Sequence, residues 1–216
     1  MGICYIIGSV PAKVNIIKSD GDLIIAAYGG MDNLRASCIV PDIVVGDMDS
    51  VSENRDFGDA KVILYPVEKD ETDSALALTE GIARGYTKFV FFGCIGGLLD
   101  HTMANIALLK GITENGYTAV FADEEMGACA ITGRTLNFSK KAVGRISVLS
   151  ITEKAENVTI SGLKYHVDNI TLNASVPLGV SNDFVGKDAF VKVSDGALMI
   201  YTKLDNITEF SDLFDF

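Results

Sequence analysis

Short apolar runs alternate with helical stretches in the first part of the chain. The runs are rich in β-branched and aromatic residues, which is typical of strands buried on both faces of a parallel sheet. They cover residues 3–7, 23–27, 43–45, 62–65, 89–92 and 117–122. Residues 72–84 place apolar side chains on one helical face, whereas residues 101–110 are apolar almost all round, which predicts a deeply buried helix. This alternation predicts a doubly wound, mostly parallel α/β sheet.

The pattern changes after Asp123, and no helical period is evident from there to the last residue. Short strand-like runs separated by turn residues take over, at residues 128–132, 135–138, 145–150, 157–161, 169–174, 189–193 and 198–202. Such spacing indicates an all-β sandwich or a partial barrel, and we favour the sandwich. We therefore predict an α/β domain over residues 1–124 and a β-sandwich domain over residues 125–216.

The composition limits the classes of function. The chain has 18 Lys and Arg against 29 Asp and Glu, a formal net charge of −11. A nucleic-acid binder needs a basic face to neutralise phosphates, and none is visible in this sequence. The chain has no apolar run of membrane-spanning length and no secretion signal, and its four cysteines match no zinc-binding spacing. We expect a cytoplasmic protein without disulfides.

The first acidic motif is GDMDS at residues 46–50, directly after a predicted strand. Alternate residues of an extended chain point the same way, so Asp47 and Asp49 project together and could share one cation. Asp, Gly and Ser also form turns, so a solvated turn is an alternative interpretation.

The second acidic motif, DETD at residues 70–73, begins the helix predicted over 72–84. Asp70 and Asp73 lie three residues apart, so both could reach one ligand. The alternative is that they cap the helix and stabilise its first turn. Lys69 is either a phosphate-reaching cation or an ordinary surface lysine.

The third motif runs from Gly93 to His101 and includes the pair Gly96 and Gly97. Glycines between a strand and a helix let backbone amides approach phosphate oxygens at the positive end of the helix dipole. Asp100 is either the N-cap of the next helix or a metal ligand or base. His101 is either a base or phosphate contact, or a structural residue of the first turn.

All three motifs follow predicted strands, and the loops after parallel strands meet at one edge of the sheet, where ligands bind. Converging carboxylates repel one another unless a cation lies among them, and Mg²⁺ usually arrives with substrate phosphates. Positioning and charge neutralisation are what phosphoryl-type transfer requires.

Together these segments resemble the thiamine pyrophosphokinase family. The matching residues are 29–30, 41–42, 46–50, 69–73, 93–105, 161–165 and 181–182. The match spans nearly the whole chain in the family's order, which makes it far more specific than any single motif.

The resemblance implies an α/β domain that binds ATP and Mg²⁺, followed by a β-sandwich domain. It implies transfer of a diphosphate group from ATP to the hydroxyl of thiamine, with release of AMP. It also implies a homodimer, with the thiamine site between the α/β domain of one subunit and the β domain of the other. Neither a nucleic acid nor a membrane is an expected partner.

The resemblance also implies roles for single residues. It assigns the metal to Asp47, Asp49, Asp70 and Asp73. It assigns catalysis to Asp49, Asp73, Asp100 and His101. Contacts to ATP or thiamine fall to Gly29, Gly30, Lys69, Gly96, Gly97, Ser181 and Asn182. For Ser181 and Asn182 the alternative is a β-turn capped by the asparagine.

Two positions depart from the family pattern. Tyr28 stands where the family often has Asp, and Leu98 stands where it usually has Arg, a natural bidentate phosphate partner. These departures leave two alternatives open: a related diphosphokinase acting on a pterin-like alcohol, and a nucleotide or thiamine sensor that binds without turnover.

Overall fold

The computed structural model describes residues 2–47, 57–66 and 71–214. The chain forms two compact units. The first contains Met1–Asn105 and Phe121–Glu124, and the second contains Ile106–Val120 and Glu125–Phe216. The architecture confirms the predicted fold class, because parallel strands with helices precede antiparallel strands, four of which form a separate sheet.

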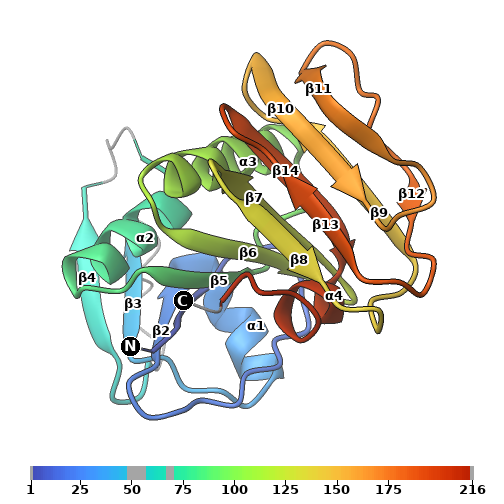
Figure 1. Ribbon diagram of the computed structural model, residues 1–216. Helices are drawn as coiled ribbons and strands as arrows, with labels where there is room; N and C mark the ends of the chain where they lie inside the picture. The colour runs from blue at the N-terminus through green and yellow to red at the C-terminus, as the bar shows by residue number, and fades with distance from the viewer. Residues whose placement is uncertain (1, 48–56, 67–70, 215–216) are drawn as a thin grey trace. The chain divides into compact units, whose positions relative to one another are not determined.

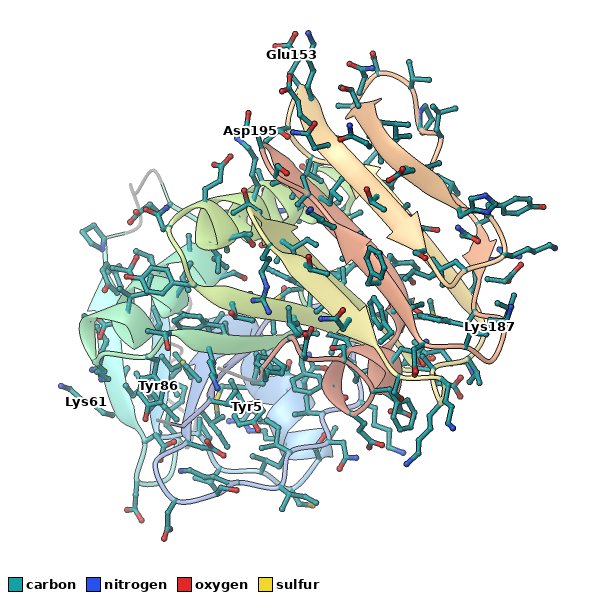
Figure 2. All side chains as sticks on the ribbon, in the orientation of Figure 1. Tyr5, Lys61, Tyr86, Glu153, Lys187 and Asp195 are labelled. Atoms are coloured by element: carbon teal, nitrogen blue, oxygen red, sulfur yellow. The ribbon has the colours of Figure 1, made fainter. Side chains whose placement is uncertain are left out.

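The first unit is built on parallel strands in the order β5-β1-β2-β3-β4 (Figure 1). Their bounds are β1 Cys4–Ile7, β2 Leu23–Ala27, β3 Ile43–Asp47, β4 Lys61–Tyr65 and β5 Lys88–Phe92. The next strand, β6 (Thr118–Asp123), stands beside β5, where the rings of Phe91 and Phe121 stack 4.2 Å apart. The strand β4 is the open edge, and Lys61 on it projects outward (Figure 2).

The helices of this unit follow the strands. They are the 3-10 turn η1 Tyr28–Gly30, α1 Met31–Ala36, α2 Asp73–Ala83 and the start of α3 (Leu99–Glu114), whose residues from Ile106 on belong to the second unit. The helix α2 packs against β1, β2 and β3 and buries Leu76, Ala77 and Leu78. The helix α1 has only six residues, too few to show a hydrophobic period in the sequence.

The prediction that residues 101–110 form a deeply buried helix is wrong in one respect. The helix α3 exists, but Leu99 and Met103 near its start are 75% and 58% exposed. Its buried positions are Asn105, Leu109, Ile112 and Thr113. These positions follow the three- and four-residue spacing of a single helical face, so one face of α3 is buried and another leaves apolar side chains exposed.

The second unit is a sandwich of two layers of antiparallel strands: β12-β9-β14-β7, which belong to the ten-stranded sheet, and the separate four-stranded sheet β11-β10-β13-β8. Its strands are β7 Met126–Thr132, β8 Thr135–Phe138, β9 Arg145–Ser150, β10 Lys154–Ser161, β11 Val167–Asn173, β12 Asn182–Asp183, β13 Ala189–Lys192 and β14 Ala197–Lys203. Inward-facing side chains of both sheets, among them Ile131, Phe138, Val148 and Val191, form one core. This alternation of buried and exposed positions makes the sandwich predictable.

One helix of the second unit was not predicted. The helix α4 (Leu204–Thr208) follows β14, so the expectation of no helix after Asp123 is wrong. It has five residues and therefore no detectable period.

None of the helices in the described ranges combines the length and the apolar content needed to cross a membrane. The four cysteines all lie in described residues and are free thiols, as expected.

Candidate active site

The carboxyl ends of the parallel strands form the edge at which the predicted motifs lie. The chain runs from β1 outward through β2, β3 and β4 and then returns to place β5 on the other side of β1. The loops after β1 and β5 therefore diverge at a topological switch point, where open α/β sheets bind ligands. Two bonds tie these loops at their roots: the Gly8 amide donates to the Phe92 carbonyl (2.7 Å), and the Val10 amide donates to the Gly93 carbonyl (2.9 Å).

A cleft of about 260 Å³ lies at this edge, wholly within the first unit. It is lined by Gly8, Ser9, Ala27, Gly29, Glu71, Thr72, Asp73, Ser74, His101 and Asn105. Three predicted site residues thus come together: Gly29, Asp73 and His101. Ser9 and Asn105 also line the cleft but were not predicted as site residues. The position of Ser9 just after the first strand was the available signal, because that loop belongs to the same sheet edge.

The start of α2 supplies the acidic side of the cleft. Thr72 is the N-cap, with its side-chain oxygen accepting from the Ala75 amide at 3.3 Å, and Asp73 is the first helical residue. The helix dipole favours a carboxylate in this first turn, so Asp73 stabilises α2 while it lines the cleft. Since Thr72 provides the cap, Asp73 is not needed for that role.

The loop between β5 and α3 carries the glycine motif. Gly96 and Gly97 have φ angles of +90° and +66°, which an alanine would adopt only with strain. Thr102 fixes the turn, because its hydroxyl accepts from the Gly96 amide (3.2 Å) and also lies within hydrogen-bonding distance of the Gly96 and Leu98 carbonyls. Gly96 and Gly97 are exposed to solvent. They lie close in sequence to His101, which lines the cleft, but they do not line it themselves.

Asp100 is not an N-cap. The helix α3 begins at Leu99, so Asp100 lies in the first turn, where its carboxylate accepts from the His101 amide at 2.9 Å. Asp100 is exposed and does not line the cleft, whereas His101 does. Leu98, the second departure from the family pattern, is 66% exposed.

Two buried groups close the region behind the cleft. The Asn105 side chain donates to the Cys94 carbonyl at 2.6 Å, and the Cys94 sulfur lies 3.6 Å from the Ser74 hydroxyl. Burial raises the pKa of the Cys94 thiol to about 11, although the contact with Ser74 acts in the opposite direction. A protonated, buried thiol is a poor nucleophile, so Cys94 is a packing residue of the site.

The reactivity of the four cysteines depends on their burial. Burial also raises the pKa of Cys4 and of Cys129 to about 12, whereas Cys38 is exposed. Iodoacetamide at about pH 8 should therefore modify only Cys38 in the native protein, since the thiolate is the reactive form. Mass spectrometry should find one adduct before unfolding and four after it. Modification of Cys94 in the native protein would contradict the closed arrangement behind the cleft.

The glycine pair after β2 has a packing role. A Cβ at Gly30 would collide with the carbonyl oxygen of Ile7 in β1, and one at Gly29 would lie 2.5 Å from the Ser9 Cβ. The neighbouring Tyr28 is buried, lies against Gly46 of β3, and is not a lining residue of the cleft. Tyr28 therefore fills space beneath the sheet edge.

Four of the predicted residues lie wholly or partly outside the described part of the chain. Asp49, Lys69 and Asp70 fall in the undescribed ranges, and Asp47 is described only as the last backbone position of β3. Within residues 2–47, 57–66 and 71–214, no three His, Cys, Asp or Glu side chains form a group that could hold a metal ion. The proposed magnesium site therefore depends on the undescribed carboxylates.

In the second unit, the side-chain amide of Asn182 bonds both backbone polar groups of Tyr165, and its Oδ1 also accepts from the Asp183 amide. Its Oδ1 accepts from the Tyr165 amide (2.9 Å) and its Nδ2 donates to the Tyr165 carbonyl (2.6 Å). Asn182 is 7% exposed, whereas Tyr165 is 61% exposed. The backbone amide of Ser181, which has a φ of +63°, donates to the Ser147 hydroxyl. Asn182 thus holds the exposed segment around Tyr165 in place.

Two family models and several known proteins match this chain. The family model for "Thiamin pyrophosphokinase, catalytic domain" matches residues 15–121, and the model for "Thiamin pyrophosphokinase, vitamin B1 binding domain" matches residues 135–198. A thiamine pyrophosphokinase of Bacillus subtilis is 27% identical over 182 residues, which cover 82% of this chain and 85% of that protein. Thiamin pyrophosphokinase 1 of Caenorhabditis elegans is 26% identical over 178 residues, covering 77% and 71%.

Solved structures share the fold. The crystal structure of thiamine pyrophosphokinase from Bacillus subtilis superposes with a TM-score of 0.82 at 21% identity, covering 94% of this chain and 99% of that one. The yeast thiamin pyrophosphokinase structure gives a TM-score of 0.71 at 17% identity, covering 97% and 88%.

Proposed function

Because this chain belongs to the thiamin pyrophosphokinase family, we propose that it transfers a diphosphate group from ATP to the hydroxyl of thiamine, giving thiamine diphosphate and AMP. The observation that carries this proposal is the match of both family models, in order, over 15–121 and 135–198. The cleft at the switch point of the parallel sheet supports it, since that is where such sheets bind nucleotides.

The cleft residues fit the first half of the reaction. Gly8, Ser9 and Gly29 offer a close backbone approach from the loops after β1 and β2, and Asp73 of α2 and His101 of α3 supply polar groups. When thiamine attacks the β-phosphorus of ATP, its hydroxyl loses a proton and AMP leaves. An aspartate or His101 accepts this proton, and Asp73 is the predicted aspartate that lines the cleft.

The acidic residues fit a magnesium ion. Mg²⁺ commonly takes only one or two protein carboxylates and completes its shell with water and substrate phosphates, so Asp73 with Asp47, Asp49 or Asp70 would suffice. When bound, Mg²⁺ would neutralise phosphate charge. Asp73 would then help to hold the ion and so orient the phosphates, and the ion would offset the negative charge of a chain whose net charge is −11.

We assign the thiamine site to the second unit and its completion to a homodimer. Three large apolar side chains of the loop after β11, Val176, Leu178 and Val180, are 46%, 69% and 51% exposed. In the first unit, Leu98, Leu99 and Met103 leave a second apolar surface exposed at the start of α3. Exposed apolar surfaces of this kind mark interaction sites, and a partner subunit of the same chain would cover them. We also place the protein in the cytoplasm, in keeping with its free cysteines.

The test of the proposed function is product identity. Purified protein incubated with thiamine, ATP and Mg²⁺ should yield AMP and thiamine diphosphate in equal amounts, measured by chromatography. ADP as the sole nucleotide product would overturn the proposal. A parallel reaction with a hydroxymethylpterin tests the related diphosphokinase activity. Calorimetric binding of thiamine and a nucleotide without AMP release would indicate a sensor.

A further inference from the structure

A buried asparagine holds the first loop of the cleft. Asn33 in α1 is 8% exposed, and its side-chain amide forms hydrogen bonds with the backbone of residues 8–12. Its Nδ2 donates to the carbonyls of Gly8 and Val10, each at 2.8 Å, and its Oδ1 accepts from the Ala12 amide at 3.1 Å. Both Nδ2 protons and the Oδ1 oxygen thus bond to one five-residue loop. This loop has no regular secondary structure, so these bonds satisfy its backbone groups and fix its shape.

The held loop is also the contact between the two sides of the switch point. The Val10 amide donates to the Gly93 carbonyl at 2.9 Å. The Val10 side chain packs over the glycine motif, where a Cβ added to Gly96 or Gly97 would lie 3.8 Å or 3.4 Å from it. Val10 therefore links residues 8–12 to the loop after β5, through its bond to Gly93 and its side chain beside Gly96 and Gly97.

The surroundings of Gly93 show how closely Asn33 packs against the loops after β1 and β5. A Cβ at Gly93 would lie 2.8 Å from Asn33 Nδ2 and 2.6 Å from the Val10 carbonyl oxygen. Asn33, the loop after β1 and the loop after β5 therefore meet with no free space between them. Removing the amide of Asn33 leaves the buried Gly8 carbonyl and the part-buried Val10 carbonyl without this donor, which costs more than a lost surface hydrogen bond.

We propose that Asn33 is a positioning residue that fixes residues 8–12, and through Val10 the glycine motif, in the shape that receives the phosphates of the nucleotide. Asn33 does not line the cleft; Gly8 and Ser9, which it holds, do. The inference rests on the proposed function, because it takes the phosphate-bearing ligand of this cleft to be ATP. Phosphate recognition by backbone and glycine segments depends on their exact spacing, and displacement of about 1 Å lowers rates by roughly a hundredfold in well-fitted sites.

The test compares Asn33→Asp with Asn206→Asp. Asn206 is the matched control: it is 1% exposed, its Oδ1 accepts from the Val143 amide, and its Nδ2 donates to the Val143 carbonyl and the Thr202 hydroxyl. It lies in the second unit and is not a lining residue of the cleft. Each substitution puts a carboxylate oxygen where an amide donated two hydrogen bonds. Thermal unfolding, calorimetric affinity for a non-hydrolysable ATP analogue with Mg²⁺, and KM for ATP and thiamine are measured for both variants.

We expect both variants to lose thermal stability. Asn33→Asp should in addition weaken nucleotide binding and raise KM for ATP by roughly tenfold, with KM for thiamine changed less than about twofold. Asn206→Asp should leave nucleotide affinity within about twofold of the parent protein. Unchanged nucleotide affinity in Asn33→Asp, or an equal loss in both variants, would overturn the inference and leave Asn33 a purely structural residue.

Two further measurements keep the test decisive. If Asn33→Asp does not fold, Asn33→Ala removes the amide without setting a charge against two carbonyls, and the same outcomes apply. Calorimetry on the parent protein separates this inference from the proposed function. A parent that binds the analogue but forms no thiamine diphosphate fails the proposed function, while the comparison of Asn33 and Asn206 variants in nucleotide binding still stands.

Discussion

Replacement of Asp73 by asparagine should lower kcat at least about a hundredfold, with little loss of fold stability. Asp73 is the predicted catalytic aspartate that the structure places in the cleft, at the first helical position of α2. Asparagine keeps the shape and removes the charge that would orient the metal-bound phosphates or accept the proton. The N-cap bond of Thr72 to the Ala75 amide does not involve Asp73, so α2 should still begin at residue 73. Loss of the favourable charge–dipole interaction costs about 0.3–1 kcal/mol.

The control for Asp73→Asn is Asp32→Asn. Asp32 is also an acidic residue in the first turn of a helix, α1, and its side chain is 71% exposed beside Arg35. Asp32 lies outside the cleft. The Asp32→Asn variant should therefore lose a similar amount of unfolding free energy and retain activity. Initial rates over a series of Mg²⁺ concentrations separate the two roles: a raised requirement for Mg²⁺ in Asp73→Asn indicates a metal ligand, and an unchanged requirement with low kcat indicates a base. Full activity of Asp73→Asn would refute both roles.

Much of the fold could be predicted from the sequence, because its elements carry their own periodic patterns. The predicted strand at residues 23–27 coincides with β2, and those at 135–138 and 145–150 coincide with β8 and β9. Burial on both faces makes a run such as β2 continuous in apolar residues, whereas one-sided burial makes the β strands of the sandwich alternate. Elements of five or six residues, such as α1 and α4, span too few turns to show a period.

The composition of the site could be predicted only in part, because the local sequence pattern does not determine the order of strands in a sheet. The sequence places Asp73 and His101 after strands but does not reveal that β5 returns beside β1. That pairing brings Ser9 into the cleft with His101, and it is a long-range consequence of how the sheet is assembled. The exposed face of α3 was missed for a related reason: an apolar side chain that a partner would cover has the same sequence pattern as one buried within its own chain.

Replacement of Gly30 by alanine should destabilise the protein by about 1–3 kcal/mol, because the new methyl group has no space. Gly30 has φ −72° and ψ −13°, a conformation that alanine adopts readily, so no backbone strain is expected. The cost arises from the collision of the added Cβ with the carbonyl oxygen of Ile7 in β1. Relief of that collision must move either β1 or the η1 turn, and both border residues of the cleft. Nucleotide affinity should therefore fall together with the midpoint of urea unfolding.

Gly111→Ala is the matched control, since it adds the same methyl group to a glycine in the interior of α3. A Cβ at Gly111 would meet nothing within 4 Å, and alanine is the better helix former. This variant should gain roughly 0.5–1 kcal/mol of stability and keep its nucleotide affinity. The Gly30→Ala and Gly111→Ala variants together also separate two explanations for the glycine pair after β2. If Gly30→Ala loses nucleotide affinity with unfolding unchanged, Gly30 is a contact for the phosphates, as the family resemblance implies. If stability and affinity fall together, the glycine is required because α1 begins directly against the backbone of β1, and phosphate binding depends on it only through that packing.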